Sequence, residues 1–168
     1  MIFPPDLLDQ LQSFKVIPWE GVVHRHMLGD YPPERPNTRG ARWNPPEVAA
    51  IYTSLDPATA LAEAEYRLGL EPFRPRAKRT LYRIRLRLNA VLDLSDRIGL
   101  EKLGITKQHL EDLDVTACQG IGGAAHWLGN DGMLVPSARH SGTNLVVYEF
   151  NRDHESEFTV LSSELVEE

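Results

Sequence analysis

The sequence has a single cysteine, Cys118, among its 168 residues, and therefore no internal disulfide bond can form. It has no apolar run that approaches the roughly 20 residues needed to span a bilayer. It also has no charged N-terminal segment followed by the apolar core of a signal peptide. From these absences we expect a protein of the reducing cytoplasm that is not inserted in a membrane.

The signatures of several reaction types are absent as well. Six histidines are scattered without an HExxH pair, and there is no second cysteine to complete a zinc site. No GxSxG motif presents a serine nucleophile, and Cys118 falls on an apolar helical stripe that predicts a buried thiol. The GIGGA segment at 120–124 lacks the GxGxxG spacing and follows no strand, so close helix packing explains it. We therefore expect no bound metal and no cofactor.

Length and composition fit one globular domain over residues 1–168. Hydrophobic residues make up 42% of the chain and charged residues 25%, as in ordinary globular proteins. The net charge is −6, but residues 1–88 carry +3 and residues 89–168 carry −9. An anionic ligand would find its cationic partners in the first half of the chain.

Hydrophobic periodicity predicts an α+β domain in which a mixed central β-sheet is flanked by helices. The predicted strands are residues 22–28, 49–54, 79–88, 132–136, 144–150 and 157–161. The predicted helices are a short one opened by Pro4 and Pro5, one at 57–68 capped by Ser54 or Asp56, two short pieces within 95–114 with Thr106 as a cap, and one at 115–128. The polar tail 162–168 is expected to fray.

The strand at 79–88 alternates clearly, and it directs Arg83, Arg85 and Arg87 outward. Together with the preceding loop it forms a run of seven basic residues from Arg74 to Arg87 without an acidic one. Nucleic-acid binding is disfavoured, because the whole chain is acidic and the outward face lacks aromatic residues. The pattern favours a solvated sheet face or a docking surface for an acidic protein partner.

A further arginine, Arg25, shares a face of the predicted strand 22–28 with Val23 and Met27. A buried arginine needs an anion, although the side chain could instead extend to solvent at a strand edge. The segment that follows, residues 29–46, is too rich in proline, glycine and asparagine for regular structure. A loop of this length in a small domain is typical of a functional site.

The segment from Gly40 to Glu65, GARWNPPEVAAIYTSLDPATALAEAE, concentrates candidate site residues. A turn presents Arg42, a strand presents Tyr52, and a helix carries Glu63 and Glu65. Residues two apart on a helix point roughly 200° apart, so only one glutamate can serve a given site. Neither lies at the centre of the apolar stripe, and helix geometry does not choose between them.

This segment closely resembles the RES domain, the toxin component of RES–Xre toxin–antitoxin pairs, in its G-x-R-W-N, Y-x-S and A-L-A-x-x-E elements. The likeness continues at His24-Arg25, at Val91-Leu92-Asp93-Leu94, and in the C-terminal serine motif GMLVPSARHSGTN at residues 132–144. Together these elements cover most of residues 20–150. One departure is Glu47, which stands where many members have glycine.

The resemblance implies a fold like that of ADP-ribosyltransferases and a toxin that degrades NAD+ in the bacterial cytoplasm until an Xre-type antitoxin neutralises it. NAD+ is then substrate rather than cofactor, and any contact with DNA runs through the antitoxin. Either a homo-oligomer or a toxin–antitoxin hetero-oligomer is compatible with it. The family pattern implies these site residues: Arg25, Arg42, Tyr52, Glu63 and Ser137. The resemblance selects Glu63 over Glu65, because Glu63 lies eleven residues after Tyr52, which is the family's spacing.

Cleavage of the nicotinamide–ribose bond suits these residue types. The transition state resembles an oxocarbenium ion and nicotinamide leaves as a neutral base, so a carboxylate such as Glu63 is needed more than a general acid. Arg25 and Arg42 can clamp the pyrophosphate, Tyr52 can stack on nicotinamide or ribose, and Ser137 can add a hydroxyl contact. We expect Glu63, Arg42 and Tyr52 to be catalytic and Arg25, Arg42, Tyr52 and Ser137 to bind NAD+.

The acceptor of the ADP-ribose is left open by the sequence. Water, inorganic phosphate and a protein side chain all require the same bond cleavage, so a mono-ADP-ribosyltransferase is an alternative to an NAD+ glycohydrolase or phosphorylase. A second alternative is a non-catalytic interaction module that uses the arginine-rich strand.

Overall fold

A computed structural model describes residues 3–167. The helices are α1 (Pro5–Gln12), α2 (Pro57–Gly69), α3 (Arg97–Lys102), α4 (Lys107–Glu111) and α5 (Thr116–Trp127), with a 3-10 turn at Glu149–Asn151. The strands are β1 (Val16–Leu28), β2 (Ala50–Ser54), β3 (Arg79–Asp93), β4 (Gly132–Pro136), β5 (Thr143–Tyr148) and β6 (Glu157–Leu165). Within the described residues no helix is long and apolar enough to cross a membrane.

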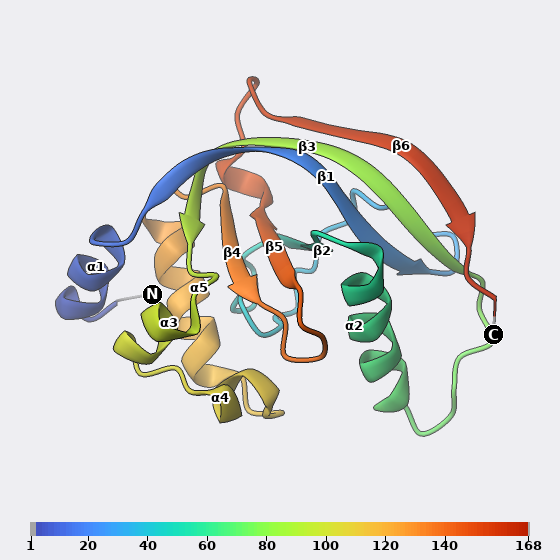
Figure 1. The fold of residues 1–168 in the computed structure, drawn as a ribbon, viewed down its shortest axis with the longest axis horizontal. Coiled ribbons are helices and arrows are strands. Elements are labelled where there is room, and N and C mark those ends of the chain that lie inside the picture. The colour runs from blue at the N-terminus through green and yellow to red at the C-terminus, as the bar shows by residue number, and fades with distance from the viewer. Residues whose placement is uncertain (1–2, 168) are drawn as a thin grey trace.

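The strands form one mixed sheet in the order β1-β2-β5-β4-β3-β6, and an additional β1–β3 pairing closes five of them into a ring. Only the β3–β4 pairing is parallel among those described. Long, curved β1, β3 and β6 make one layer over the shorter β2, β5 and β4 (Figure 1). Helices α1, α3, α4 and α5 gather at one side, and α2 stands at the other (Figure 1). The predicted α+β fold with a mixed sheet is confirmed.

Strands β1 and β3 are longer than predicted. The strand predicted at 22–28 begins at Val16, and its pairing with β3 shifts register between Ile17 and Trp19. Pro18 lies at that irregularity, where a proline is tolerated because no ladder hydrogen bond is lost. Pro18 and Gly21 interrupt the alternation of side chains that predicts the rest of β1 from the sequence.

Contrary to the prediction, the C-terminal tail is not frayed. Strand β6 continues to Leu165 and pairs with β3 as far as Thr80, and Val166 N donates to Arg79 O at 3.0 Å. The prediction for residues 162–168 is therefore wrong over most of its length, while Glu168 lies outside the described residues. Backbone pairing holds this strand although its side chains are largely exposed. The polarity of these side chains therefore does not indicate a frayed tail.

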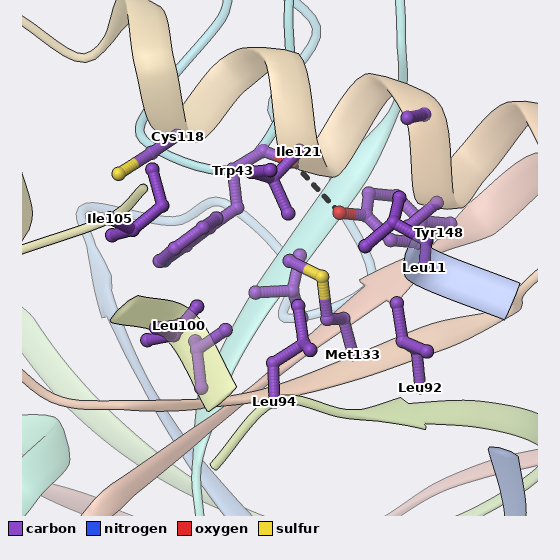
Figure 2. Packing of buried hydrophobic residues seen from close by; sticks show 14 of the residues in the cluster. Leu11, Trp43, Leu92, Leu94, Leu100, Ile105, Cys118, Ile121, Met133 and Tyr148 are labelled. Atoms are coloured by element: carbon purple, nitrogen blue, oxygen red, sulfur yellow. Dashed lines mark hydrogen bonds between the residues drawn. The ribbon is translucent and has the colours of Figure 1, made fainter. Parts of the chain in front are cut away.

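Two clusters of buried apolar side chains hold the layers together. One lies between the short strands and the α5 side of the molecule, and contains Trp43, Cys118, Met133 and Tyr148 (Figure 2). The other joins the long strands to the short ones and includes Val23, Ile84, Leu86, Leu134 and Val147. Burial of the Cys118 thiol is confirmed. The short strands are covered on both faces, and they provide the rigid base of the fold.

The GIGGA segment serves close packing, as predicted. A Cβ added to Gly122 would lie 1.8 Å from the backbone oxygen of Trp43, so α5 contacts the loop main chain directly. Tyr148 Oη donates to the same oxygen at 2.9 Å (Figure 2). This contact fixes the loop that carries Trp43 against the helical side.

We predict that Gly122→Ala lowers the free energy of unfolding by about 1–3 kcal/mol, because the added methyl group forces α5 away from the backbone of Trp43. The matched control is Gly120→Ala in the same helix, where an added Cβ meets no atom within 4 Å. That control should raise stability by up to about 1 kcal/mol, since alanine favours the helix. Urea unfolding measures both, and equal effects would contradict the packing argument.

Candidate active site

A cavity of about 520 Å³ lies between α2, β1, the end of β2 and the loop between β1 and β2. Its size suits a small-molecule ligand. Three of the five predicted site residues, Arg25, Tyr52 and Glu63, line it. The other two, Arg42 and Ser137, do not.

Helix α2 presents Glu63 to this cavity. Asp56 is its N-cap, with a side-chain oxygen 2.8 Å from Thr59 N, and Pro57 occupies the first turn. The β4–β5 turn packs closely on this end of the helix, because a Cβ on Gly142 would lie 2.0 Å from Thr59 Oγ1. Two segments that are far apart in the sequence are thereby held against each other.

The carboxylate of Glu63 is fixed through one oxygen only. Its Oε1 accepts hydrogen bonds from Ser137 Oγ at 2.6 Å and from Asn144 Nδ2 at 2.9 Å. Ser54 Oγ donates to Asn144 Oδ1 at 2.7 Å, which turns the amide nitrogen toward Glu63. Across residues 3–167, Oε2 has no hydrogen-bond partner. One carboxylate oxygen is therefore held and the other is available to a ligand.

Ser137 acts on Glu63 rather than on the cavity. It is 2% exposed, and its Oγ accepts from the backbone N of Arg139 at 3.1 Å and of His140 at 3.2 Å. These donors leave the hydroxyl proton for Glu63. The sequence identified this residue but not its partner.

Glu65 lies on an exposed part of α2, away from the cavity lining. It pairs with Arg74 at 3.1 Å and with Arg79 at 2.9 Å. The hydrogen bond from Arg74 and the charges of both arginines lower the pKa of its carboxyl group. The two glutamates thus have separate surroundings, as helix geometry required.

Tyr52 lines the cavity, and its hydroxyl holds the neighbouring loop. Tyr52 Oη donates to Asn44 Oδ1 at 2.5 Å and accepts from Trp43 N at 2.9 Å. Burial raises the pKa of this hydroxyl above its ordinary value. Tyr52 therefore remains protonated and acts as neither an acid nor a base.

Arg42 turns away from the cavity toward α4. Its Nη1 donates to His109 O at 2.6 Å and its Nη2 to Asp112 O at 2.5 Å. Both carbonyls belong to the C-terminal end of that short helix, where backbone oxygens lack helical partners. Arg42, the arginine of the G-x-R-W-N element, thus ties the loop to the helical side of the fold.

Arg25 is partnered by carbonyls instead of an anion. Its Nη1 donates to Pro33 O at 3.0 Å and its Nη2 to Arg35 O at 2.8 Å. Burial, and secondarily the charge of Arg67, lowers the pKa of the guanidinium to about 10, so it stays charged at neutral pH. The side chain borders the cavity and holds the loop that forms the opposite wall.

The cavity has an excess of positive charge. Its lining contains four arginines and two glutamates, namely Arg25, Arg35, Arg39, Arg67, Glu63 and Glu71. His24 and His26 add no charge at neutral pH, because burial lowers the pKa of both, that of His26 to about 4. An excess of two positive charges favours an anionic ligand.

Sequence reasoning missed three residues of the site: Arg67, Ser54 and Asn144. Arg67 lies four residues after Glu63, a helical spacing that places both on one face. Ser54 is the serine of the Y-x-S element and Asn144 ends the C-terminal motif, so both were visible as motif positions, but neither was assigned a role in the site. Among residues 3–167 no group of three or more His, Cys, Asp or Glu is arranged to hold a metal ion.

We predict that Arg25→Lys lowers the free energy of unfolding by about 1–3 kcal/mol, because an ammonium cannot serve both carbonyls. Amide hydrogen exchange should become faster in residues 31–39, where those carbonyls hold the loop. Arg39→Lys is the matched control, since that guanidinium makes no hydrogen bond to residues 3–167, and it should change stability by less than about 0.5 kcal/mol. Unchanged exchange in Arg25→Lys would show that the loop does not depend on this contact.

Comparison with known proteins identifies the family of this chain. NAD(+) phosphorylase MbcT of Mycobacterium tuberculosis and of Mycobacterium bovis are each 33% identical over 116 residues, which span 66% of this chain and 62% of those relatives. The crystal structure of the M. tuberculosis MbcT–MbcA toxin–antitoxin complex matches with a TM-score of 0.86 and 25% identity, over 97% of this chain and 93% of that one. A family model of the RES domain matches residues 18–165, and the chain belongs to the RES domain family.

Proposed function

We propose that the protein is the toxin of a toxin–antitoxin pair and degrades NAD+ by cleaving its nicotinamide–ribose bond. The observation that carries this proposal is the state of Glu63, which is held at Oε1 by two neutral donors and unpartnered at Oε2 within residues 3–167, beside a positively charged cavity. The likeness to relatives named NAD(+) phosphorylase supports the same reaction.

In this mechanism Glu63 faces the nicotinamide ribose. The C1″–N1 bond breaks with its electron pair moving to N1, so nicotinamide leaves neutral and needs no proton. Positive charge develops at C1″ and the ring oxygen, and the Glu63 carboxylate stabilises it. An acceptor oxygen then bonds to C1″, from water with loss of a proton or from phosphate without one.

The remaining residues orient the substrate or the walls of the site. Tyr52 offers its ring to nicotinamide or ribose, and Arg35 and Arg39 of the cavity lining meet the pyrophosphate. Ser137 and Asn144 hold Glu63. Arg42 and Arg25 act as positioning residues for the loop between β1 and β2, since their Nη atoms are bound to carbonyls.

A cognate Xre-type antitoxin is the proposed partner, and DNA binding would belong to that protein. The support is the match to the toxin in an MbcT–MbcA toxin–antitoxin complex. NAD+ is an intracellular substrate, which places the proposed reaction in the cytoplasm. The alternative of a non-catalytic arginine-rich surface loses support, because Arg85 pairs with Glu20 at 2.9 Å and Arg87 donates to Glu155 O.

We predict that Glu63→Gln reduces nicotinamide release from NAD+ by roughly 100- to 1,000-fold, since the amide cannot stabilise the developing cation. Glu65→Gln on the same helix should keep wild-type activity within about threefold, because it lies outside the cavity lining. Chromatography of the products, with and without phosphate and candidate acceptor proteins, follows the reaction. Wild-type protein that releases no nicotinamide with any acceptor would refute the enzyme, and label transferred to protein would identify an ADP-ribosyltransferase.

A further inference from the structure

Arg67 is a cation of the cavity wall. Its guanidinium makes no hydrogen bond and no ion pair with any of residues 3–167, although it borders the cavity. Its position four residues after Glu63 puts the two side chains one helical turn apart, about 6 Å along the axis. The guanidinium and the carboxylate therefore flank the same part of the cavity.

The charge of Arg67 affects the pKa of other residues that line the cavity. After burial, the charge of Arg67 is the largest cause that lowers the pKa of Arg25, and it also contributes at His26 and Tyr52. These three residues come from the strands that face α2 across the cavity. The positive field of Arg67 thus extends to the wall opposite its own helix.

The proposed reaction brings two anions to this site, the pyrophosphate of NAD+ and the acceptor when that acceptor is phosphate. Arg35 and Arg39 lie on the loop wall, and Arg35 stacks on Tyr31 with 3.9 Å between guanidinium carbon and ring centre. Arg67 lies on α2 beside Glu63. An anion held next to Glu63 is also next to C1″, the carbon at which the acceptor must bond.

A phosphate so close to a carboxylate is repelled unless a cation lies between or beside them. Arg67 supplies that cation, and its planar fork matches two phosphate oxygens. Phosphate dianion also needs no base, whereas water must lose a proton. The arrangement therefore favours phosphate over water as nucleophile.

We propose that Arg67 binds inorganic phosphate as the acceptor substrate, an assignment that rests on the proposed NAD+ cleavage. One phosphate oxygen donates a lone pair to C1″ as the C1″–N1 bond breaks toward nicotinamide. The products are ADP-ribose 1″-phosphate and neutral nicotinamide, and no residue gains or loses a proton. Arg67 holds the nucleophile and Glu63 stabilises the carbon that it attacks.

Steady-state kinetics of Arg67→Gln, with NAD+ and inorganic phosphate varied separately, test this assignment. We expect KM for phosphate to rise by roughly tenfold or more, from loss of a charge-assisted contact. KM for NAD+ should stay within about twofold, and cleavage in phosphate-free buffer should be unchanged. Arg39→Gln should show the opposite pattern, with a higher KM for NAD+ and an unchanged KM for phosphate.

Each other outcome has a defined meaning. A rise in KM for NAD+ alone in Arg67→Gln would assign the residue to the dinucleotide and overturn the proposal, as would unchanged values for both substrates. Wild-type cleavage that does not depend on phosphate would overturn it while leaving NAD+ degradation intact. Absence of cleavage by wild type would instead refute the proposed function. Arg67 is exposed, and thermal unfolding of the variant should match wild type.

Discussion

The hydrogen bond between Tyr52 and Asn44 is the contact on which the site depends most. The loop between β1 and β2 has almost no regular structure, so its buried backbone groups need other partners. Asn44 is 0% exposed; its amide accepts from Tyr52 Oη and donates to Val48 O at 2.8 Å and to Asn37 at 3.3 Å. One asparagine thus joins strand β2 to two turns of the loop, and Arg25 holds the remainder.

A second set of contacts assembles the carboxylate side of the cavity. Glu63 comes from α2, Ser137 from the turn after β4, and Asn144 and Ser54 from paired positions on β5 and β2. The pairing of Ser54 with Asn144 follows from strand register, so the orientation of the Glu63 carboxylate is set by the sheet. The site is therefore a property of the whole topology rather than of the segment from Gly40 to Glu65.

Sequence patterns predicted the elements whose side chains alternate or repeat against a core, and they failed where backbone pairing alone decides. Pro18 interrupts the strand pattern in the first half of β1, and the polar side chains at the end of β6 show no hydrophobic alternation. At the site, the resemblance to the family selected Glu63, but the partners of Arg25 and Arg42 depend on tertiary contacts that no local pattern encodes. Glu47 has φ 76°, a left-handed conformation that glycine adopts without strain, which fits the glycine expected at this position from the resemblance.

The two glutamates of α2 are both held in place, but by groups that differ in charge. Arg74 and Arg79 hold Glu65 with opposite charges. Most of the negative charge of Glu65 is therefore neutralised by protein groups. Ser137 and Asn144 fix Glu63 with neutral donors, so its position is set while its charge remains available to a cationic transition state. The cavity cations pair with no carboxylate within residues 3–167. The same helix can therefore carry one structural and one reactive carboxylate because their partners differ in charge.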